Sequence, residues 1–310
     1  MRITAELLAY VAKKTGVKQV ELLEKDMLLH LLLQELATDE RFRTHYVFKG
    51  GTCLIKCYLG YYRFSEDLDF SYARQEEFEG KSEKQIRKQL SREIDTLAGI
   101  LEEIAAKIGL DFKPDKKDRH YMEFGGGNKF TTFRLWYESA ELRTAQFIKV
   151  QINYVEKIKY PFKQLVAKSI LSGLDEKELK FRRPEAAKLL EPLIVQTYDI
   201  REILAEKVRA ILTRKGTKAR DFIDVYLIQK EACVKPEDLE AEILDKTRFI
   251  LKYEKYRENL QQKIAAKPAF KLGEEQRLIL KPLGEEFSQH TKHLAEYANK
   301  LTKNIIQNPG

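Results

Sequence analysis

The sequence predicts an α+β, or mixed α/β, fold in which helices extend a central sheet at both ends of the chain. Short β-rich runs occur between residues 46 and 155. Residues 4–37 and 200–305 instead carry apolar side chains three and four positions apart, as amphipathic helices do. Strands and helices follow one another without regular β–α–β alternation, which favours this fold class.

The first elements lead into a glycine pair. Residues 4–15 and 19–37 are expected to form helices, and the run YVFKGG at 46–51 is expected to form a strand that ends in a turn. Thr52 is then expected to cap a short helix, which Gly60 ends.

Further strands follow in the middle of the chain. The alternation of FSEDLDFSY predicts a strand at 64–72, and the long amphipathic pattern at 82–109 predicts a helix. The turn GGGN at 125–128 precedes two strands, 130–137 and 146–155, which we expect to be neighbours in the sheet.

The length of 310 residues is enough for one large domain or two modest ones. Prolines interrupt residues 160–196, and strong helical patterns follow at 200–214 and 218–230. We therefore predict a core with N-terminal helices in residues 1–160 and a mainly helical part in residues 161–310.

Composition narrows the class of protein. Hydrophobic residues make up 43% of the chain, so a packed core is expected, and no apolar run reaches the roughly 18–20 residues of a membrane span. The N-terminus lacks the apolar core of a signal peptide. The three cysteines form no CxxC pair, which argues against disulfides and a zinc site and predicts a cytoplasmic protein without a membrane partner.

The positive charge is concentrated in one part of the sequence. The net charge is +8, and residues 141–230 carry 19 basic and 12 acidic side chains, a net charge of +7. Such a segment fits a polyanionic partner such as RNA or a nucleoside triphosphate. The alternative is a solvated surface with surplus lysine.

A glycine turn and a pair of aspartates form the first candidate site. Gly50 and Gly51 stand where a strand meets a helix, where glycine lets the backbone approach a ligand and the helix start offers N–H groups to phosphate. Asp67 and Asp69 are two apart on a predicted strand and therefore face the same way. Two such carboxylates suit Mg²⁺ or Mn²⁺. Each feature alone also has a structural explanation, a common turn and a solvated strand face.

This combination resembles the nucleotide-binding motif of the polymerase-beta-like nucleotidyltransferase superfamily. The resemblance implies a polymerase-beta-like core sheet with helical additions at both ends. It also implies that Gly50, Gly51 and Thr52 hold the triphosphate, and that Asp67 and Asp69 bind the metal and help to activate the attacking hydroxyl.

The longer run FKGGTCLIKCYLGYYRFSEDLDFSY is similar to the signature of the AbiEii/AbiGii family, the toxin components of bacterial abortive-infection and type IV toxin–antitoxin systems. Arg63, Ser65 and Glu66 belong to this narrower pattern. The resemblance implies that Ser65 joins the nucleotide-binding residues.

A second candidate site lies on the helices at 200–214 and 218–230. A helical projection places Lys207 and Arg214 within an apolar stripe, and Asp221 and Asp224 share an apolar face of the next helix. A cation on a buried face is costly unless it meets an anion. These four residues either pair with one another as a structural network or serve a triphosphate.

The run AEKVRAILTRKGTKARDFIDVYLI resembles the second conserved block of the AbiEii family, and the match covers Lys207, Arg220, Asp221 and Asp224. The resemblance implies that Lys207 neutralises charge on the phosphates and that Arg220 and Asp224 also contribute to nucleotide binding. If the cluster serves a triphosphate, Arg214 is expected to contact it as well. Asp221 would orient the cations or join the chemistry.

The pattern departs from the superfamily on the strand FIKVQINYV. Where a third carboxylate is often found, this chain has Gln151 and Asn153. Amides add no negative charge, which puts a second tightly held metal in doubt and leaves open a catalytically inactive, nucleotide- or RNA-binding relative.

Trp136 is expected to pack in the core rather than to stack on bases.

The resemblance implies a toxin that transfers a nucleotide from a nucleoside triphosphate to RNA, with a tRNA 3′ end as one candidate, or to a protein acceptor. A cognate antitoxin would neutralise it. The sequence does not select the nucleotide, the acceptor, the way the antitoxin acts or the oligomeric state.

Overall fold

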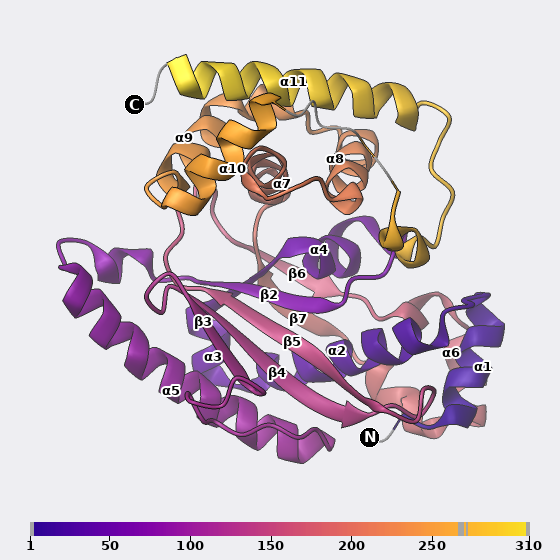
Figure 1. Cartoon of the computed structure of the whole chain (residues 1–310). Helices are drawn as coiled ribbons and strands as arrows, with labels where there is room; N and C mark the ends of the chain where they lie inside the picture. Colours follow the sequence, from indigo (N-terminus) through magenta and orange to yellow (C-terminus); the bar gives the residue numbers. More distant parts are fainter. Residues whose placement is uncertain (1–2, 266–269, 271, 308–310) are drawn as a thin grey trace. The chain divides into compact units, whose positions relative to one another are not determined.

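A seven-stranded mixed sheet organises the first of two compact units in the computed structural model, which describes residues 3–265, 270 and 272–307 (Figure 1). The first unit comprises residues 1–156 and 162–197, and the second comprises 157–161 and 198–310. The sequence analysis drew its boundary at 160/161. The strands at 163–167 and 193–197 instead pair within the sheet, because hydrogen bonding to existing strands gives this proline-interrupted segment partners for its backbone.

The sheet unit contains strands and helices in alternating groups, which gives the mixed α+β fold that the sequence predicts. Its strands run in the order β3-β4-β5-β2-β1-β7-β6. Its helices and strands have the following bounds: α1 (Ala5–Thr15), α2 (Val20–Thr38), α3 (Glu40–His45), β1 (Tyr46–Lys49), α4 (Gly50–Cys53), β2 (Asp67–Tyr72), α5 (Glu83–Ile108), β3 (Met122–Gly125), β4 (Phe130–Glu138), β5 (Ala145–Asn153), β6 (Lys163–Ala167), α6 (Glu176–Arg182) and β7 (Leu193–Thr197).

The register separates an apolar face of the sheet from a polar face. β1 pairs antiparallel with β2, with Lys49 opposite Asp69, and β2 pairs parallel with β5, with Asp69 opposite Gln151. Residues two apart along these strands share that face, so Asp67 and Lys149 also lie on it. The intervening residues point to the other face and are buried, as Leu68 is. The polar face therefore carries the candidate site.

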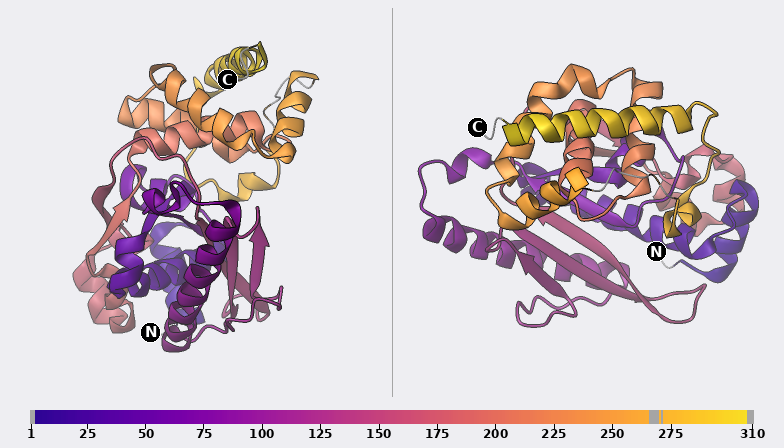
Figure 2. Two further views of the ribbon diagram at one scale, coloured as in Figure 1. Left: turned by 90° about the vertical axis from the view of Figure 1, so that its left-hand side faces the viewer. Right: turned by 45° about the horizontal axis from the view of Figure 1, so that its top comes forward.

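Helices cover the apolar face of the sheet. α2 packs against β2, β5 and β7, and α5 packs against β4 and α2, so two long helices bury this side (Figures 1 and 2). α5 begins with a capping box at Ser82 and Gln85 and ends at Gly109, whose positive φ of 79° closes the helix. These ends agree with the helix predicted at 82–109.

The segment after the glycine pair differs from its prediction. Helix α4 begins at Gly50, with Lys49 as the preceding residue, so Thr52 lies inside the helix instead of capping it. The Thr52 hydroxyl donates to the Asp67 carbonyl at 2.5 Å, because a buried hydroxyl needs an acceptor within the fold. The helix continues as a π-helix, η1 (Leu54–Leu59), and Gly60 follows it at φ 73° as expected.

The second unit is helical. Its long terminal helix α11 packs across α7, α8, α9 and α10 (Figure 2). No helix within the described ranges is long and apolar enough to cross a membrane. The bounds of the helices are α7 (Ile200–Thr213), α8 (Ala219–Ala232), α9 (Glu240–Ile250), α10 (Glu254–Ala265) and α11 (Phe287–Gln307).

Candidate functional site

Gly50 brings the start of α4 directly against the carboxylate of Asp69. Its φ is +76°, a region that side-chain-bearing residues rarely adopt. A Cβ added at Gly50 would lie 2.9 Å from Asp69 Cβ and 3.0 Å from its Cγ. Position 50 therefore requires glycine for two reasons, the backbone conformation and the close approach of the acid.

Gly51 makes room for a buried cation. A Cβ at this position would lie 2.6 Å from an Arg63 guanidinium nitrogen and 3.2 Å from the Ser65 hydroxyl. Arg63 is 1% exposed, and it donates to the Phe64 carbonyl at 2.7 Å. The guanidinium and the Ser65 hydroxyl thus lie beside the first turn of α4. The N-terminal end of a helix favours anions, and these two hydrogen-bond donors lie beside that end of α4.

Asp67 and Asp69 are the only half-buried residues of β2, whose other four residues are buried. Each has a lysine on a neighbouring strand. Lys149 on β5 places its ammonium 3.8 Å from Asp67 Oδ1, and Lys49 is the register partner of Asp69 on β1. Since two carboxylates on one face repel each other, these cations lower the cost of keeping both ionised in the free protein.

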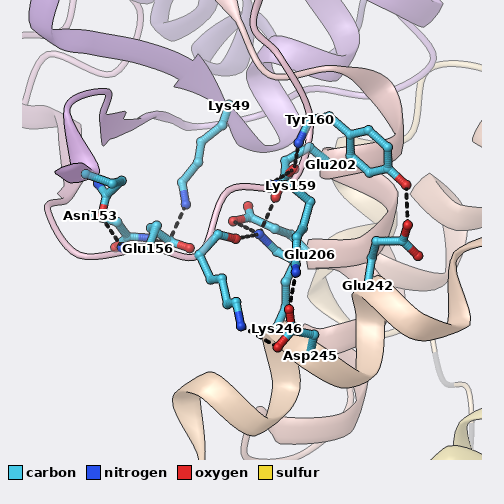
Figure 3. A network of polar contacts seen from close by, with 12 residues as sticks. Lys49, Asn153, Glu156, Lys159, Tyr160, Glu202, Glu206, Glu242, Asp245 and Lys246 are labelled. Carbon is cyan, nitrogen blue, oxygen red and sulfur yellow. Dashed lines mark hydrogen bonds and ion pairs between the residues drawn. The ribbon is translucent and has the colours of Figure 1, made fainter. Parts of the chain in front are cut away.

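Gln151 occupies the position beside Asp69 on β5, where the sequence analysis looked for a third acid. Its amide donates to the Thr132 hydroxyl at 3.3 Å. An acid does lie near this strand, namely Glu156, which accepts from Asn153 at 2.5 Å and pairs with the Lys49 ammonium at 2.9 Å (Figure 3). The sequence analysis missed Glu156 because it follows the end of β5, where the alternation of the strand no longer applies.

The donor set fits a hard divalent cation that also takes oxygens from its substrate. In the part of the chain that the structure describes, no group of three His, Cys, Asp or Glu side chains could hold a metal by itself. The aspartate pair supplies two half-buried carboxylates on one face of β2. Mg²⁺ is commonly held by one or two carboxylates together with phosphate oxygens and water.

The second candidate cluster lies within the helical unit. Lys207 on α7 places its ammonium 2.7 Å from Asp224 Oδ2 and 3.3 Å from Asp221 Oδ1, both on α8. The side chain of Lys207 is 13% exposed, whereas the two acids are 2% exposed or less. The pairing that the sequence analysis considered as a structural network is thus present.

Two arginines from the sequence analysis lie at the ends of these helices. Arg214, which follows α7, pairs with Asp221 Oδ2 at 2.5 Å. Arg220 instead pairs with Glu275 at 3.6 Å and is not part of the Lys207 cluster. Lys263 on α10 was not predicted. Burial lowers the pKa of its ammonium, with the opposing charge of Asp221 acting against this shift.

Comparison with known proteins identifies the family. The sequence matches the family model described as "Nucleotidyl transferase AbiEii toxin, Type IV TA system" over residues 31–301. The chain belongs to this family. It is therefore a nucleotidyltransferase of the AbiEii toxin family of type IV toxin–antitoxin systems, as its motifs predict. Comparison with curated protein sequences finds no match.

One solved structure shows the same fold as this AbiEii protein. MenT4, a nucleotidyltransferase toxin from Mycobacterium tuberculosis H37Rv, superposes with a TM-score of 0.58 at 19% identity, covering 96% of this chain and 89% of that chain. JHP933 from Helicobacter pylori gives a TM-score of 0.44 at 16% identity, with coverage of 93% and 95%. The first of these confirms the predicted nucleotidyltransferase-like fold.

A buried ion pair that sequence reasoning missed organises the helical unit of this AbiEii protein. The Lys246 ammonium on α9 contacts Glu202 Oε1 on α7 and donates to the Lys157 carbonyl at 2.6 Å (Figure 3). Glu202 also accepts from the backbone N–H groups of Lys159 and Tyr160, at 2.8 and 3.0 Å. Residues 157–161 are thereby fixed to α7 and α9.

Proposed function

We propose that this AbiEii protein transfers a nucleotidyl group from a nucleoside triphosphate to a hydroxyl of an RNA or protein acceptor, with Mg²⁺ or Mn²⁺ at Asp67 and Asp69. One observation carries the proposal. The carboxylate of Asp69 lies against Gly50, which has a positive φ and begins the first turn of a helix. A metal at the aspartates would therefore be within reach of phosphates bound at the glycine turn.

The reaction forms one phosphoester bond and breaks one phosphoanhydride bond. The acceptor hydroxyl oxygen attacks the α-phosphorus, pyrophosphate leaves with the electrons of the α–β bond, and the hydroxyl proton passes to a carboxylate of the aspartate pair or to water. A bound divalent cation would lower the pKa of the attacking hydroxyl and offset charge on the pyrophosphate.

Nearby groups of the chain have separate roles in this proposal. The backbone N–H groups of Gly51 and Thr52 would hold the β- and γ-phosphates. The Thr52 hydroxyl is not assigned to this role because it already donates to the backbone carbonyl of Asp67. The Ser65 hydroxyl would donate to a phosphate oxygen. Arg63 would add a fixed positive charge beside them.

We assign the cluster on α7 and α8 a role in nucleotide binding. Lys207, with its side chain 13% exposed, would neutralise charge that develops on the phosphates, and Arg214 would assist it. Asp221 would act by orienting these two cations, because it pairs with both. Asp224 would hold Lys207, and Arg220 would also contribute to nucleotide binding.

A catalytically inactive, nucleotide- or RNA-binding protein is the second candidate. The amide of Gln151 beside Asp69 favours it, because a third carboxylate would strengthen metal binding. The intact aspartate pair favours the enzyme. Under either reading, we propose that the chain acts in the cytoplasm, where nucleoside triphosphates are available, as the toxin of a bacterial abortive-infection or phage-defence system that a cognate antitoxin neutralises.

Labelled triphosphates test the proposal directly. The full chain is incubated with total RNA and cell protein, with each of the four α-labelled triphosphates in turn, with Mg²⁺ or with EDTA. We expect label on one class of macromolecule, with Mg²⁺ only. Label on neither class with any triphosphate, while the triphosphates still bind, would support the inactive relative.

A further inference from the structure

Three aromatic rings lie next to Asp67 on the polar face of the sheet, together with the strand cations Lys149 and Arg134. Trp136 on β4 and Phe147 on β5 are register partners, with ring centroids 4.8 Å apart. The ring of His120 stacks on Trp136 at 4.1 Å, with an interplanar angle of 4°. We call His120, Trp136 and Phe147 the aromatic platform.

These rings are not part of the hydrophobic core. Trp136 and Phe147 are half-buried and His120 is exposed, whereas the residues that alternate with them on the two strands, Leu135 and Ile148, are fully buried. The sequence analysis expected Trp136 to pack in the core. The register instead places it on the face that carries Lys149 and Asp67, because residues two apart on a strand share a face.

Three cations lie near the Phe147 ring, two from the strands and Lys25 from α2. The ammonium groups of Lys25 and Lys149 lie 5.9 and 5.6 Å from its centroid, and the Arg134 guanidinium carbon lies 5.7 Å from it. Lys25 pairs with Glu66 at 3.3 Å, and Arg134 with Glu123 at 2.6 Å. Lys149 has the weaker contact to Asp67, at 3.8 Å, so it connects the platform to the aspartate pair.

The order of the strands places the aspartates between the platform and the glycine turn. β2, with Asp67 and Asp69, lies between β1, which leads into Gly50, and β5, which carries Phe147. In phosphoryl transfer the attacking and leaving oxygens are roughly in line on opposite sides of phosphorus. If pyrophosphate leaves at the glycine turn, the acceptor hydroxyl approaches from the side of β5 and β4.

We propose that the aromatic platform binds the unpaired terminal bases of an RNA acceptor, with Lys149 and Arg134 contacting its phosphates. This inference rests on the proposed transfer reaction and selects RNA over protein as the acceptor. Single-stranded nucleic acids are bound by aromatic rings interleaved with cations, because every base has a face that stacks and every linkage has a charge. A protein hydroxyl requires neither.

Binding of RNA to the full chain tests the platform without turnover. The probe is a fluorescent 12-nucleotide single-stranded RNA with a free 3′ end, added without triphosphate. Phe147→Leu and Trp136→Leu should each weaken binding about 5- to 150-fold, which corresponds to the ~1–3 kcal/mol of one stacked base. Phe147→Tyr keeps a ring and should bind nearly as the wild type does. The matched control is Phe181→Leu on α6, whose ring is 87% exposed and lies outside the platform.

A charge variant gives a second measurement that does not depend on the aromatic substitutions folding well. Lys149→Gln should reduce the slope of log affinity against log salt by about 0.7, the value for one phosphate contact on a single strand. Lys177→Gln, an exposed lysine on α6, should leave the slope unchanged. Equal slopes for the wild type and Lys149→Gln would overturn the assignment of Lys149 to an RNA phosphate.

Triphosphate binding separates this inference from the proposed function. Phe147→Leu and Trp136→Leu should leave triphosphate affinity unchanged while they weaken RNA binding and raise the KM for RNA. Loss of triphosphate affinity with normal RNA binding would overturn the inference and assign the platform to the nucleotide base. Label transferred only to protein would also overturn it. Platform-dependent RNA binding with no transfer to any acceptor would support the platform and refute the proposed reaction.

Discussion

Substitution of Lys207 distinguishes most clearly between a structural and a catalytic role for the helical unit. Its ammonium lies 2.7 Å from Asp224 Oδ2, an acid that is 0% exposed. At an effective dielectric constant of about 20, such a pair attracts by roughly 6 kcal/mol, and desolvation offsets part of this. Removing one partner of a buried pair typically costs about 3–5 kcal/mol because the other charge stays buried.

Lys207→Met should therefore lower the melting temperature by on the order of 10 °C. Arg214 still pairs with Asp221 in this variant, so Asp224 is the acid whose electrostatic stabilisation decreases most. Adding Asp224→Asn removes that charge, and the double variant should regain most of the lost stability. Thermal unfolding of the two variants and the wild type, in the same buffer, measures both steps.

Nucleotidyl transfer by the double variant then decides the role of Lys207. If Lys207 neutralises charge on the phosphates, the folded double variant should lose about a hundredfold or more in rate, which corresponds to roughly 3 kcal/mol in the barrier. A refolded double variant with wild-type turnover would show that Lys207 only holds α7 to α8. A Lys207→Met protein as stable as the wild type would refute the reasoning about the buried pair.

Three further predictions follow from local geometry. Gly50→Ala should abolish transfer because its Cβ would displace Asp69, and it should also lower the melting temperature because alanine is strained at a positive φ; wild-type turnover would contradict this. Lys246→Met should cost about 3–5 kcal/mol in urea unfolding, because it leaves Glu202 buried without its cation; an unchanged midpoint would contradict this. Burial, and then the charge of Lys56, hold the pKa of His30 well below 6.5. The free energy of unfolding should therefore fall as the pH drops below about 6.5, and His30→Leu should make this fall smaller. Equal pH dependence of the two proteins would contradict this prediction.

The sign for His30 follows from proton binding. Below pH 6.5 the unfolded chain protonates this histidine while the folded chain keeps it neutral, so acid favours the unfolded state. Within the described residues, neither of its ring nitrogens has a hydrogen-bond partner. Replacement by leucine should therefore not cost a hydrogen bond, and the variant should be at least as stable at pH 6.

Local periodicity was sufficient to predict the features that lie within one element. The two-residue spacing of Asp67 and Asp69 placed both on one face of a strand, and the structure confirms that they share it. A helical projection placed Lys207 within the apolar stripe of its helix, with pairing to Asp221 and Asp224 as one of two alternatives, and the structure shows these ion pairs. Their catalytic roles stay predictions, because geometry in the free protein does not measure turnover.

Features that depend on distant pairing could not be predicted in this way. β6 and β7 join the sheet through a single register pair between Phe48 and Thr197. The prolines near these two short strands interrupt the sequence pattern from which strands are predicted. Glu202 and Lys246 meet although 44 residues separate them, and neither position departs from an ordinary helical pattern. The prediction that Trp136 packs in the core was wrong because the sequence of a nine-residue strand does not show which of its two faces the helices cover.

Transfer of label by aspartate variants tests the central claim most directly. The wild type, Asp67→Asn, Asp69→Asn and the matched control Asp95→Asn, an exposed aspartate on α5, are compared with the labelled triphosphate that the wild type uses, in Mg²⁺ and in EDTA. We predict that both site variants lose at least about a hundredfold in rate with unchanged melting temperature, that Asp95→Asn keeps wild-type turnover, and that EDTA abolishes transfer. Wild-type turnover by Asp67→Asn or Asp69→Asn would contradict the assignment of the reaction centre to this pair.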